Sequence, residues 1–206
     1  QPGIGKTDMA RQVSAETGRD FLVDVATTAE PSDVRGLPAV IRGRAEYLPY
    51  GFLRRIIEAD RPTLALIDDL GHASGEVQKA YLHLLLARTV GDRAVSPHVS
   101  FVAATNDVGQ RAGVTGLLSP LQNRCIHIRI EPAAGPWVSW AVSAAVHPEI
   151  VASVRSTPQL FDDWTPPTGI EATCTPRSMR MLSDVVNVGG STIEDYASCV
   201  GRAVAI

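Results

Sequence analysis

The chain begins with Gln1-Pro2-Gly3-Ile4-Gly5-Lys6-Thr7, and this stretch decides the fold. It matches the end of the pattern G-x-x-x-x-G-K-[ST], whose first glycine would lie one position before Gln1. Glycines let the backbone turn with positive φ and point successive N–H groups at an anion. We therefore expect a loop that binds phosphate groups, a strand upstream of Gln1 that presents it, and a chain that is a fragment of a longer one.

The expected ligand of this loop is a nucleoside triphosphate, a dense anion that needs closely approaching donors. Lys6 supplies a compact charge for the β and γ phosphates, and the Thr7 hydroxyl is the expected Mg²⁺ ligand. Residues 7–17 predict a helix that ends at Gly18, and the dipole at its start also favours an anion. The alternative is a chance glycine-rich turn before a helix. The predicted nucleotide-binding residues are Pro2, Gly3, Ile4, Gly5, Lys6, Thr7 and Asp8.

A short apolar run at residues 63–67 predicts a strand buried on both faces, and it leads into Asp68-Asp69. Ligands of open α/β sheets bind at the carboxyl ends of the strands, so both carboxylates are expected near the ligand. Asp68 would hold Mg²⁺, and Asp69 would orient or deprotonate the attacking water. The alternative is that the two acids only cap the following helix.

A second apolar run, at residues 99–104, predicts a neighbouring strand that ends in Thr105-Asn106. An amide at the tip of this strand can position water against the γ-phosphate, so Asn106 is the next candidate. The alternative is a turn, for which Asn106-Asp107 is well suited.

Two arginines are further candidates. Arg124 precedes residues 125–130, whose apolar and polar side chains alternate and predict a half-exposed strand. Arg177 lies in the first turn of a helix that Thr175-Pro176 should open, and a cation is electrostatically unfavourable there. A bound anion would explain that placement. The alternative for either arginine is a surface salt bridge.

Strands that alternate with helices predict a parallel α/β sheet. We expect a nucleotide-binding α/β domain at residues 1–131 and a small helical lid at residues 132–206, joined by a linker rich in proline, glycine and alanine. Residues 35–48 and 89–97 are either small hairpin inserts or plain connecting loops, and residues 27–49 and 157–176 are mostly loop. The remaining expected elements are a strand at 20–26 and helices at 50–60, 74–88, 136–146, 177–187 and 193–206.

Composition narrows the class of partner. The net charge of −3 and the pI near 5.9 give no strong attraction to nucleic acid or to anionic membranes, and no apolar run is long enough for a transmembrane helix. The three widely spaced cysteines, Cys125, Cys174 and Cys199, fit reduced thiols better than disulfides or a zinc site, so we expect a cytoplasmic protein.

Taken together, these residues resemble the AAA+ ATPases, and most closely their MoxR-like branch. The resemblance covers nearly the whole chain, with the motifs in the family's order. It implies that Lys6 and Thr7 belong to Walker A and that Asn106 is sensor 1. It further implies that Arg124 is an arginine finger acting on the neighbouring subunit, and that Arg177 is sensor 2. The matching pieces are Pro2-Gly3-Ile4-Gly5-Lys6-Thr7, Leu64-Ala65-Leu66-Ile67-Asp68-Asp69 (Walker B), Ala103-Ala104-Thr105-Asn106, Leu121-Gln122-Asn123-Arg124 and Thr175-Pro176-Arg177-Ser178.

The chain departs from this pattern in three places. The first Walker A glycine is absent. The second Walker B acid is Asp69, where the family usually has Glu, and its shorter side chain is expected to activate water more slowly. Asn123 precedes Arg124 where the family usually has Asp, so the finger lacks its usual ion-pair support.

The resemblance implies an ATPase with ATP and Mg²⁺ as ligands that works as a homo-oligomer, most commonly a hexameric ring. The ring would remodel or assemble a protein client, for example a protein with a von Willebrand A-type domain. Two alternatives stay open: a nucleotide-gated binding scaffold with little hydrolysis, and a nucleic-acid motor or loader. The acidic net charge argues against the latter.

Overall fold

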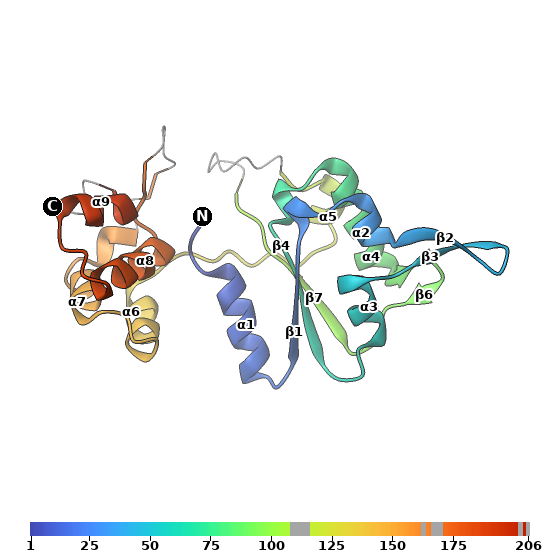
Figure 1. Ribbon diagram of the computed structural model, residues 1–206, viewed down its shortest axis with the longest axis horizontal. Helices are drawn as coiled ribbons and strands as arrows, with labels where there is room; N and C mark the ends of the chain where they lie inside the picture. The colour runs from blue at the N-terminus through green and yellow to red at the C-terminus, as the bar shows by residue number, and fades with distance from the viewer. Residues whose placement is uncertain (108–115, 162–163, 166–170, 202–203, 205–206) are drawn as a thin grey trace. The chain divides into compact units, whose positions relative to one another are not determined.

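The computed structural model describes residues 1–107, 116–161, 164–165, 171–201 and 204 (Figure 1). The chain divides into two compact units, one formed by Lys6–His127 and the other by Gln1–Gly5 together with Ile128–Ile206. The change between the units at residues 127–128 lies four residues before the domain boundary expected from sequence. The first five residues group with the C-terminal part of the chain. Each unit is described by itself.

The first unit is built on a parallel sheet of three strands in the order β1 (Asp20–Val25), β4 (Thr63–Asp68) and β7 (Val99–Ala103) (Figure 1). The central strand β4 is buried from Thr63 to Ile67, which explains its continuous apolar run. All three strands run in the same direction, so their carboxyl ends meet at one edge of the sheet. The predicted parallel α/β fold is therefore confirmed.

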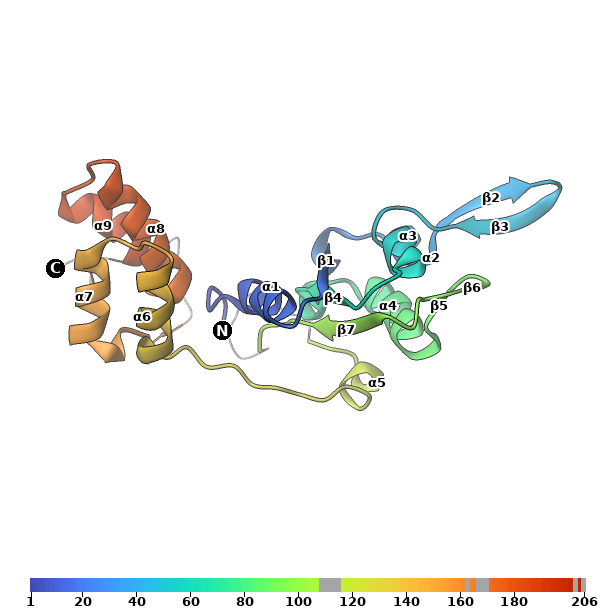
Figure 2. The same ribbon diagram turned by 90° about the horizontal axis from the view of Figure 1, so that it is seen from below.

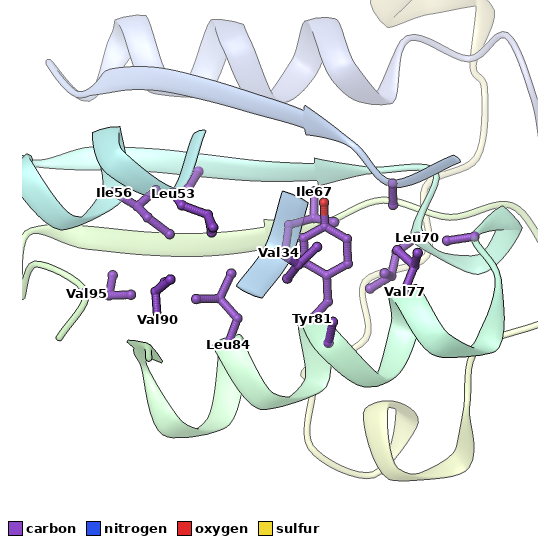
Figure 3. Close-up of a cluster of buried hydrophobic side chains, with 14 of the residues drawn as sticks. Val34, Leu53, Ile56, Ile67, Leu70, Val77, Tyr81, Leu84, Val90 and Val95 are labelled. Atoms are coloured by element: carbon purple, nitrogen blue, oxygen red, sulfur yellow. The ribbon is translucent and has the colours of Figure 1, made fainter. Parts of the chain in front are cut away.

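Helices cover both faces of this sheet. Helix α1 (Lys6–Glu16) contacts β1 and β4, and the Arg11 guanidinium lies over the Phe21 ring at 4.7 Å. On the other face, α3 (Gly51–Glu58) and α4 (Gly75–Ala87) enclose the main core (Figure 3). The Ser74 hydroxyl caps α4 by accepting from the Val77 N–H. The helices predicted at 7–17, 50–60 and 74–88 are thus confirmed to within about two residues at each end, the usual uncertainty of helix ends.

Two hairpins interrupt the connections. Strands β2 (Leu37–Ile41) and β3 (Arg44–Leu48) pair antiparallel, and so do β5 (Thr89–Val90) and β6 (Arg93–Ala94). Arg42 and Gly43 join β2 to β3 with φ of 50° and 78°, the two positive angles that a tight hairpin turn needs. Figures 1 and 2 both show the β2–β3 hairpin extending away from the sheet. The hairpin interpretation of both inserts is confirmed.

The predicted loop at residues 27–49 also contains a 3₁₀ turn, η1 (Ala26–Thr28), and a short helix, α2 (Pro31–Arg35), which the sequence analysis did not anticipate. Reciprocal hydrogen bonds between Glu30 and Asp33 cap the start of α2. Five residues with one proline give no helical periodicity that could have been recognised from sequence.

The strand predicted at residues 125–130 is wrong. After the short helix α5 (Ser119–Gln122), this segment is irregular, and Ile126 and Ile128 are 94% and 81% exposed. Alternation specifies two faces, but a strand also needs a neighbour to pair with. In the described part of the chain the sheet ends at β7, and no strand forms a ladder with this segment.

The described residues of the second unit form four helices around their own core: α6 (Ala134–Ser143), α7 (Pro148–Ser156), α8 (Pro176–Asn187) and α9 (Ile193–Val200), with a 3₁₀ turn, η4 (Pro158–Phe161). Trp137 packs edge-on against Phe161 at 5.6 Å, and its indole N–H donates to the Pro176 carbonyl at 3.2 Å. Trp140, three positions after Trp137, is 41% exposed.

The helices predicted at 136–146, 177–187 and the start of 193–206 are confirmed. Residues 202–203 and 205–206 of the predicted last helix, and residues 162–163 and 166–170 of the predicted loop, lie outside the described residues.

Within the described chain, every helix is too short or too polar to cross a membrane.

Candidate nucleotide-binding site

The phosphate-loop sequence forms the tight turn that its glycines predict. Gly3 and Gly5 have φ of 73° and 85°, in the left-handed region that favours glycine. Ile4 between them is buried, and Lys6 begins α1 directly after Gly5. The chain therefore passes from a glycine-rich turn into a helix N-terminus, which is the backbone arrangement that favours phosphate. Asp8 is exposed in the first turn of α1, where an acidic side chain favours the helix dipole.

Lys6 contacts the residue that follows the neighbouring strand tip. Its ammonium nitrogen Nζ donates to Asn106 Oδ1 at 2.6 Å, although the two residues are 100 positions apart. Asn106 is buried and follows β7 after Ala104 and Thr105. Its side chain is therefore directed at the start of α1.

Thr7 and Asp68 form a second contact between α1 and the sheet edge. The Thr7 hydroxyl donates to Asp68 Oδ2 at 2.5 Å, and Asp68 Oδ1 accepts from the Asp69 N–H at 3.1 Å. A hydroxyl oxygen beside a carboxylate is a pair of hard oxygen donors, which suits Mg²⁺. Among the described residues there is no group of three or more His, Cys, Asp or Glu side chains that could hold a metal ion by themselves. The donor set thus fits a magnesium ion whose other ligands are phosphate and water rather than a metal held by protein alone.

Asp69 has an unusual backbone conformation. Its φ of 53° and ψ of 35° lie in the left-handed region, which costs a residue other than glycine about 1 kcal/mol or more. It precedes a 3₁₀ turn, η2 (Leu70–His72), yet its side chain makes no capping hydrogen bond there. The carboxylate is 42% exposed and so accessible to water. The helix-capping alternative for the two acids therefore does not describe Asp69.

His72 is a member of this group that the sequence analysis missed. Its ring is only 14% exposed, with Nδ1 3.6 Å from Asp69 Oδ1 and Nε2 3.4 Å from Asn106 Nδ2. His72 Nδ1 is buried and makes no hydrogen bond within 3.5 Å. Asp69 and His72 are three positions apart, so the pattern Asp-x-x-His could have suggested the contact if a 3₁₀ turn had been anticipated.

Arg124 is not among these contacts. It follows α5 with an exposed side chain, and its guanidinium donates to the Pro120 carbonyl at 3.1 Å. Within the described residues it forms no ion pair.

Arg177 belongs to the second unit, as does the turn at Gly3. Thr175 and Ser178 form reciprocal capping bonds at the start of α8, which confirms the predicted cap. The Arg177 backbone N–H donates to the Gly3 carbonyl at 2.9 Å, while its side chain is exposed. The phosphate-loop turn is therefore attached to the first turn of α8.

One more carboxylate lies at the end of a strand. Tyr81, whose ring fills the main core (Figure 3), donates its hydroxyl to Asp24 Oδ2 on β1 at 2.7 Å. Burial raises the pKa of Asp24 above its ordinary value, opposed by the Tyr81 hydrogen bond and assisted by the charge of Asp33. Burial, followed by the charge of Asp24, also raises the pKa of Tyr81, so the phenol remains the proton donor.

The parallel sheet, the glycine turn and the carboxylates at the strand ends define an α/β AAA+ core followed by a helical region. The family model of the AAA domain (dynein-related subfamily) matches residues 1–125, more than half of the chain, and the chain belongs to this family. No functionally curated protein sequence matches it.

Solved structures support the fold. The P216G mutant of RuvB from Thermotoga maritima superposes with a TM-score of 0.56 at 16% identity, over 99% of this chain and 57% of RuvB. NtrX from Brucella abortus in complex with ADP superposes with a TM-score of 0.53 at 15% identity, over 98% of this chain and 47% of NtrX. The chain thus spans about half the length of these proteins, and identities this low establish the fold alone.

Proposed function

We propose that this protein binds and hydrolyses ATP with Mg²⁺ and works as a ring that remodels or assembles a protein partner, in the manner of the MoxR-like AAA+ proteins. The observation that carries the hydrolytic part is the convergence of Lys6 with Asn106 and of Thr7 with Asp68 at one sheet edge. An ammonium group, a hydroxyl–carboxylate pair and a helix N-terminus are the elements that phosphoryl transfer needs for positioning and charge neutralisation.

Each residue has a separate role in this proposal. Lys6 binds the β and γ phosphates, and Thr7 and Asp68 would hold Mg²⁺, whose bound charge offsets that of the phosphates. Asp69 accepts a hydrogen bond from the attacking water and so orients it. Asn106 fixes the position of the same water. Water oxygen forms a bond to the γ-phosphorus, the bond from that phosphorus to the β–γ bridging oxygen breaks, and the water proton passes to solvent or to phosphate.

The nucleotide site is tested by replacing Lys6. Lys6→Ala should abolish ATP binding, because it removes the charge that faces the phosphates. The chain has only two lysines, so Lys79→Ala, which removes an exposed lysine paired with Glu76 on α4, is a matched control. Titration of a fluorescent ATP analogue measures both affinities. Unchanged affinity in Lys6→Ala would contradict the assignment of the loop.

Assembly into a ring is the second part of the proposal, and it rests on Arg124. The resemblance implies a ring of six subunits. A guanidinium that is exposed in one subunit can stabilise charge on the nucleotide of the next, and Arg177 would report the γ-phosphate to the helical lid. The ATPase rate per subunit should then rise with the concentration of full-length protein and collapse in Arg124→Ala. Arg54→Ala, which removes an exposed arginine of α3, should leave this dependence unchanged.

The partner surface of the proposed ring is the β2–β3 hairpin. Leu37, Val40 and Tyr47 are exposed on it, with Val40 at 76%, and exposed apolar side chains favour contact with another protein. The client class suggested by the resemblance is a protein with a von Willebrand A-type domain. Stimulation of the ATPase by such a partner should be lost in Val40→Ser with Tyr47→Ser, while the unstimulated rate persists.

A nucleotide-gated scaffold is the second candidate, and Asp69 is the observation that favours it. Its carboxylate is one methylene shorter than the usual glutamate, so water activation is expected to be slower. Asp69→Glu discriminates between the two functions: a large gain in turnover favours the scaffold, and little change favours a working ATPase. Salt-sensitive binding of DNA would instead support a nucleic-acid motor, against which the net charge of −3 argues.

A further inference from the structure

His72 lies between two residues that the proposed hydrolysis uses. Its two ring nitrogens face different partners, Nδ1 toward Asp69 Oδ1 at 3.6 Å and Nε2 toward Asn106 Nδ2 at 3.4 Å. Asn106 also contacts Lys6 at 2.6 Å. The four side chains therefore lie one beside the next, in the order Lys6, Asn106, His72 and Asp69, at the carboxyl edge of the sheet, and the His72–Asp69 pair is just beyond hydrogen-bond distance.

The chemistry of the donors sets the direction of this series. An ammonium group can only donate, so the Asn106 oxygen must face Lys6 and the Asn106 NH₂ group must face His72. That NH₂ group donates, so His72 Nε2 must be the unprotonated acceptor. In the neutral ring the single N–H is then on Nδ1, the nitrogen nearest to Asp69.

The backbone explains how His72 reaches Asp69. The left-handed conformation of Asp69 starts the η2 turn, and the His72 N–H donates to the Asp69 carbonyl at 2.9 Å. In a 3₁₀ turn, side chains three positions apart lie over one another. His72 Nδ1 is buried and makes no hydrogen bond within 3.5 Å, and Asp69 Oδ1 lies just beyond that limit at 3.6 Å.

We propose that His72 is a positioning residue that fixes the Asp69 carboxylate relative to Asn106 by donating from Nδ1 to Asp69 while accepting at Nε2 from Asn106. This inference rests on the proposed function, because it assigns Asp69 the task of orienting the attacking water. A short, exposed aspartate has rotational freedom that a partner at its side removes. His72 thereby compensates for the missing methylene of Asp69 by holding its carboxylate in one orientation.

The test compares three replacements of His72 in the full-length protein. His72→Ala removes the ring, His72→Phe keeps an aromatic ring of similar size without nitrogens, and His72→Asn places an amide N–H close to the position of Nδ1. We expect kcat to fall about 10-fold or more in the Ala and Phe variants, since a displaced group of this kind costs up to about 100-fold. We expect His72→Asn to recover most of the rate, and KM and ATP affinity to stay within about twofold in all three.

The outcomes separate this inference from the proposed function. If the wild type turns over ATP and all three variants have the same kcat within twofold, the inference about His72 is overturned while the proposed function stands. Parallel loss of kcat, ATP affinity and melting temperature in Phe and Ala would also overturn it, because that pattern describes a structural role. No turnover by wild type would remove the proposed function, and with it the task assigned to His72.

The protonation pattern gives a second measurement that does not depend on turnover. Nitrogen NMR of the histidine side chains should show His72 with its proton on Nδ1, and Asn106→Ala should abolish that preference by removing the donor to Nε2. A proton on Nε2 in the neutral wild-type ring would contradict the proposed direction of hydrogen bonding.

Discussion

Thr7 and Asp68 are 61 positions apart, and a hydrogen bond of 2.5 Å joins the hydroxyl of one to the carboxylate of the other. The bond links the first turn of α1 to the last residue of β4. The bond holds two oxygen ligand atoms next to each other without the help of a bound ion. Pre-arranged oxygens of this kind lower the cost of ordering the site around a hard cation.

The first prediction concerns this pair. Wild-type protein should bind ATP more tightly with Mg²⁺ than with EDTA, and Asp68→Asn should lose most of that difference because a neutral amide is a weaker ligand for the cation. Asp92→Asn, which changes an exposed acid in the β5–β6 turn, is the control. Affinities measured with and without Mg²⁺ in all three proteins decide the matter. A magnesium effect of equal size in Asp68→Asn and wild type would exclude Asp68 as the ligand.

The second prediction concerns pH and Asp24. Burial raises the pKa of Asp24, so its protonated form is favoured in the folded state. The stability that this group contributes is fully present below its unfolded pKa and is lost as the pH rises through its raised folded pKa. Asp24→Asn does not titrate, and its free energy of unfolding should therefore improve relative to wild type between pH 4 and pH 7. Urea unfolding at both pH values measures the change.

Tyr81→Phe tests the same contact from the other side. It removes the donor that lowers the Asp24 pKa and leaves the carboxylate without this hydrogen bond, so the fold should lose about 1–3 kcal/mol at pH 7. In the double variant with Asp24→Asn the loss should be smaller, because no buried charge is left unpaired. Equal losses in the two backgrounds would mean that the hydroxyl does not interact with the Asp24 charge.

The third prediction concerns Arg88, which ends α4 and supports the β5–β6 hairpin. Its guanidinium donates to the carbonyls of Ser96 and Val99 at 2.9 Å and lies 5.4 Å from the centre of the Phe101 ring. Arg88→Met keeps most of the stem and removes both hydrogen bonds, so unfolding should become easier by about 2 kcal/mol. Arg93→Met in the same hairpin is exposed and should have little effect on the chemical denaturation midpoint.

The fourth prediction concerns thiol reactivity. Cys125 is exposed, Cys199 is buried, and burial raises the pKa of the Cys174 thiol to about 11. At pH 8 iodoacetamide should therefore modify Cys125 first, as read by mass spectrometry of tryptic peptides. Cys125 follows Arg124, so ring assembly with ATP should slow its modification if Arg124 meets a neighbouring subunit. Equal rates with and without assembly would place Arg124 away from the subunit contact.

The parts of the fold that could be predicted from sequence have local causes. The turn at Gly3 and Gly5 follows from the conformational freedom of glycine, and β4 follows from an apolar run that only a buried strand accommodates. The site residues at the strand ends were predictable for the same reason, because parallel strands bring their carboxyl ends together. Their individual roles remain predictions that the experiments above test.

The parts that could not be predicted depend on neighbours distant in sequence. His72 reaches the site because Asp69 adopts a left-handed backbone conformation. Aspartate can adopt that conformation, but its presence in a sequence does not predict it. The alternation at Ile126 and Ile128 indicated a strand, although pairing requires a second strand that alternation does not supply. The hydrogen bond from the Tyr81 hydroxyl to Asp24 joins residues 57 positions apart, so it depends on how α4 packs against β1.

The junction between Gly3 and Thr175 has a consequence for how this protein can evolve. A methyl group added at Gly3 would lie 2.8 Å from Thr175 Oγ1, the oxygen that caps α8, on a backbone whose φ already disfavours any side chain. Drift at position 3 is therefore blocked twice, and shortening residue 175 to make room would cost the helix its cap. The two positions should vary together or not at all. The requirement for glycine at position 3 is therefore imposed by the start of α8 as well as by nucleotide binding.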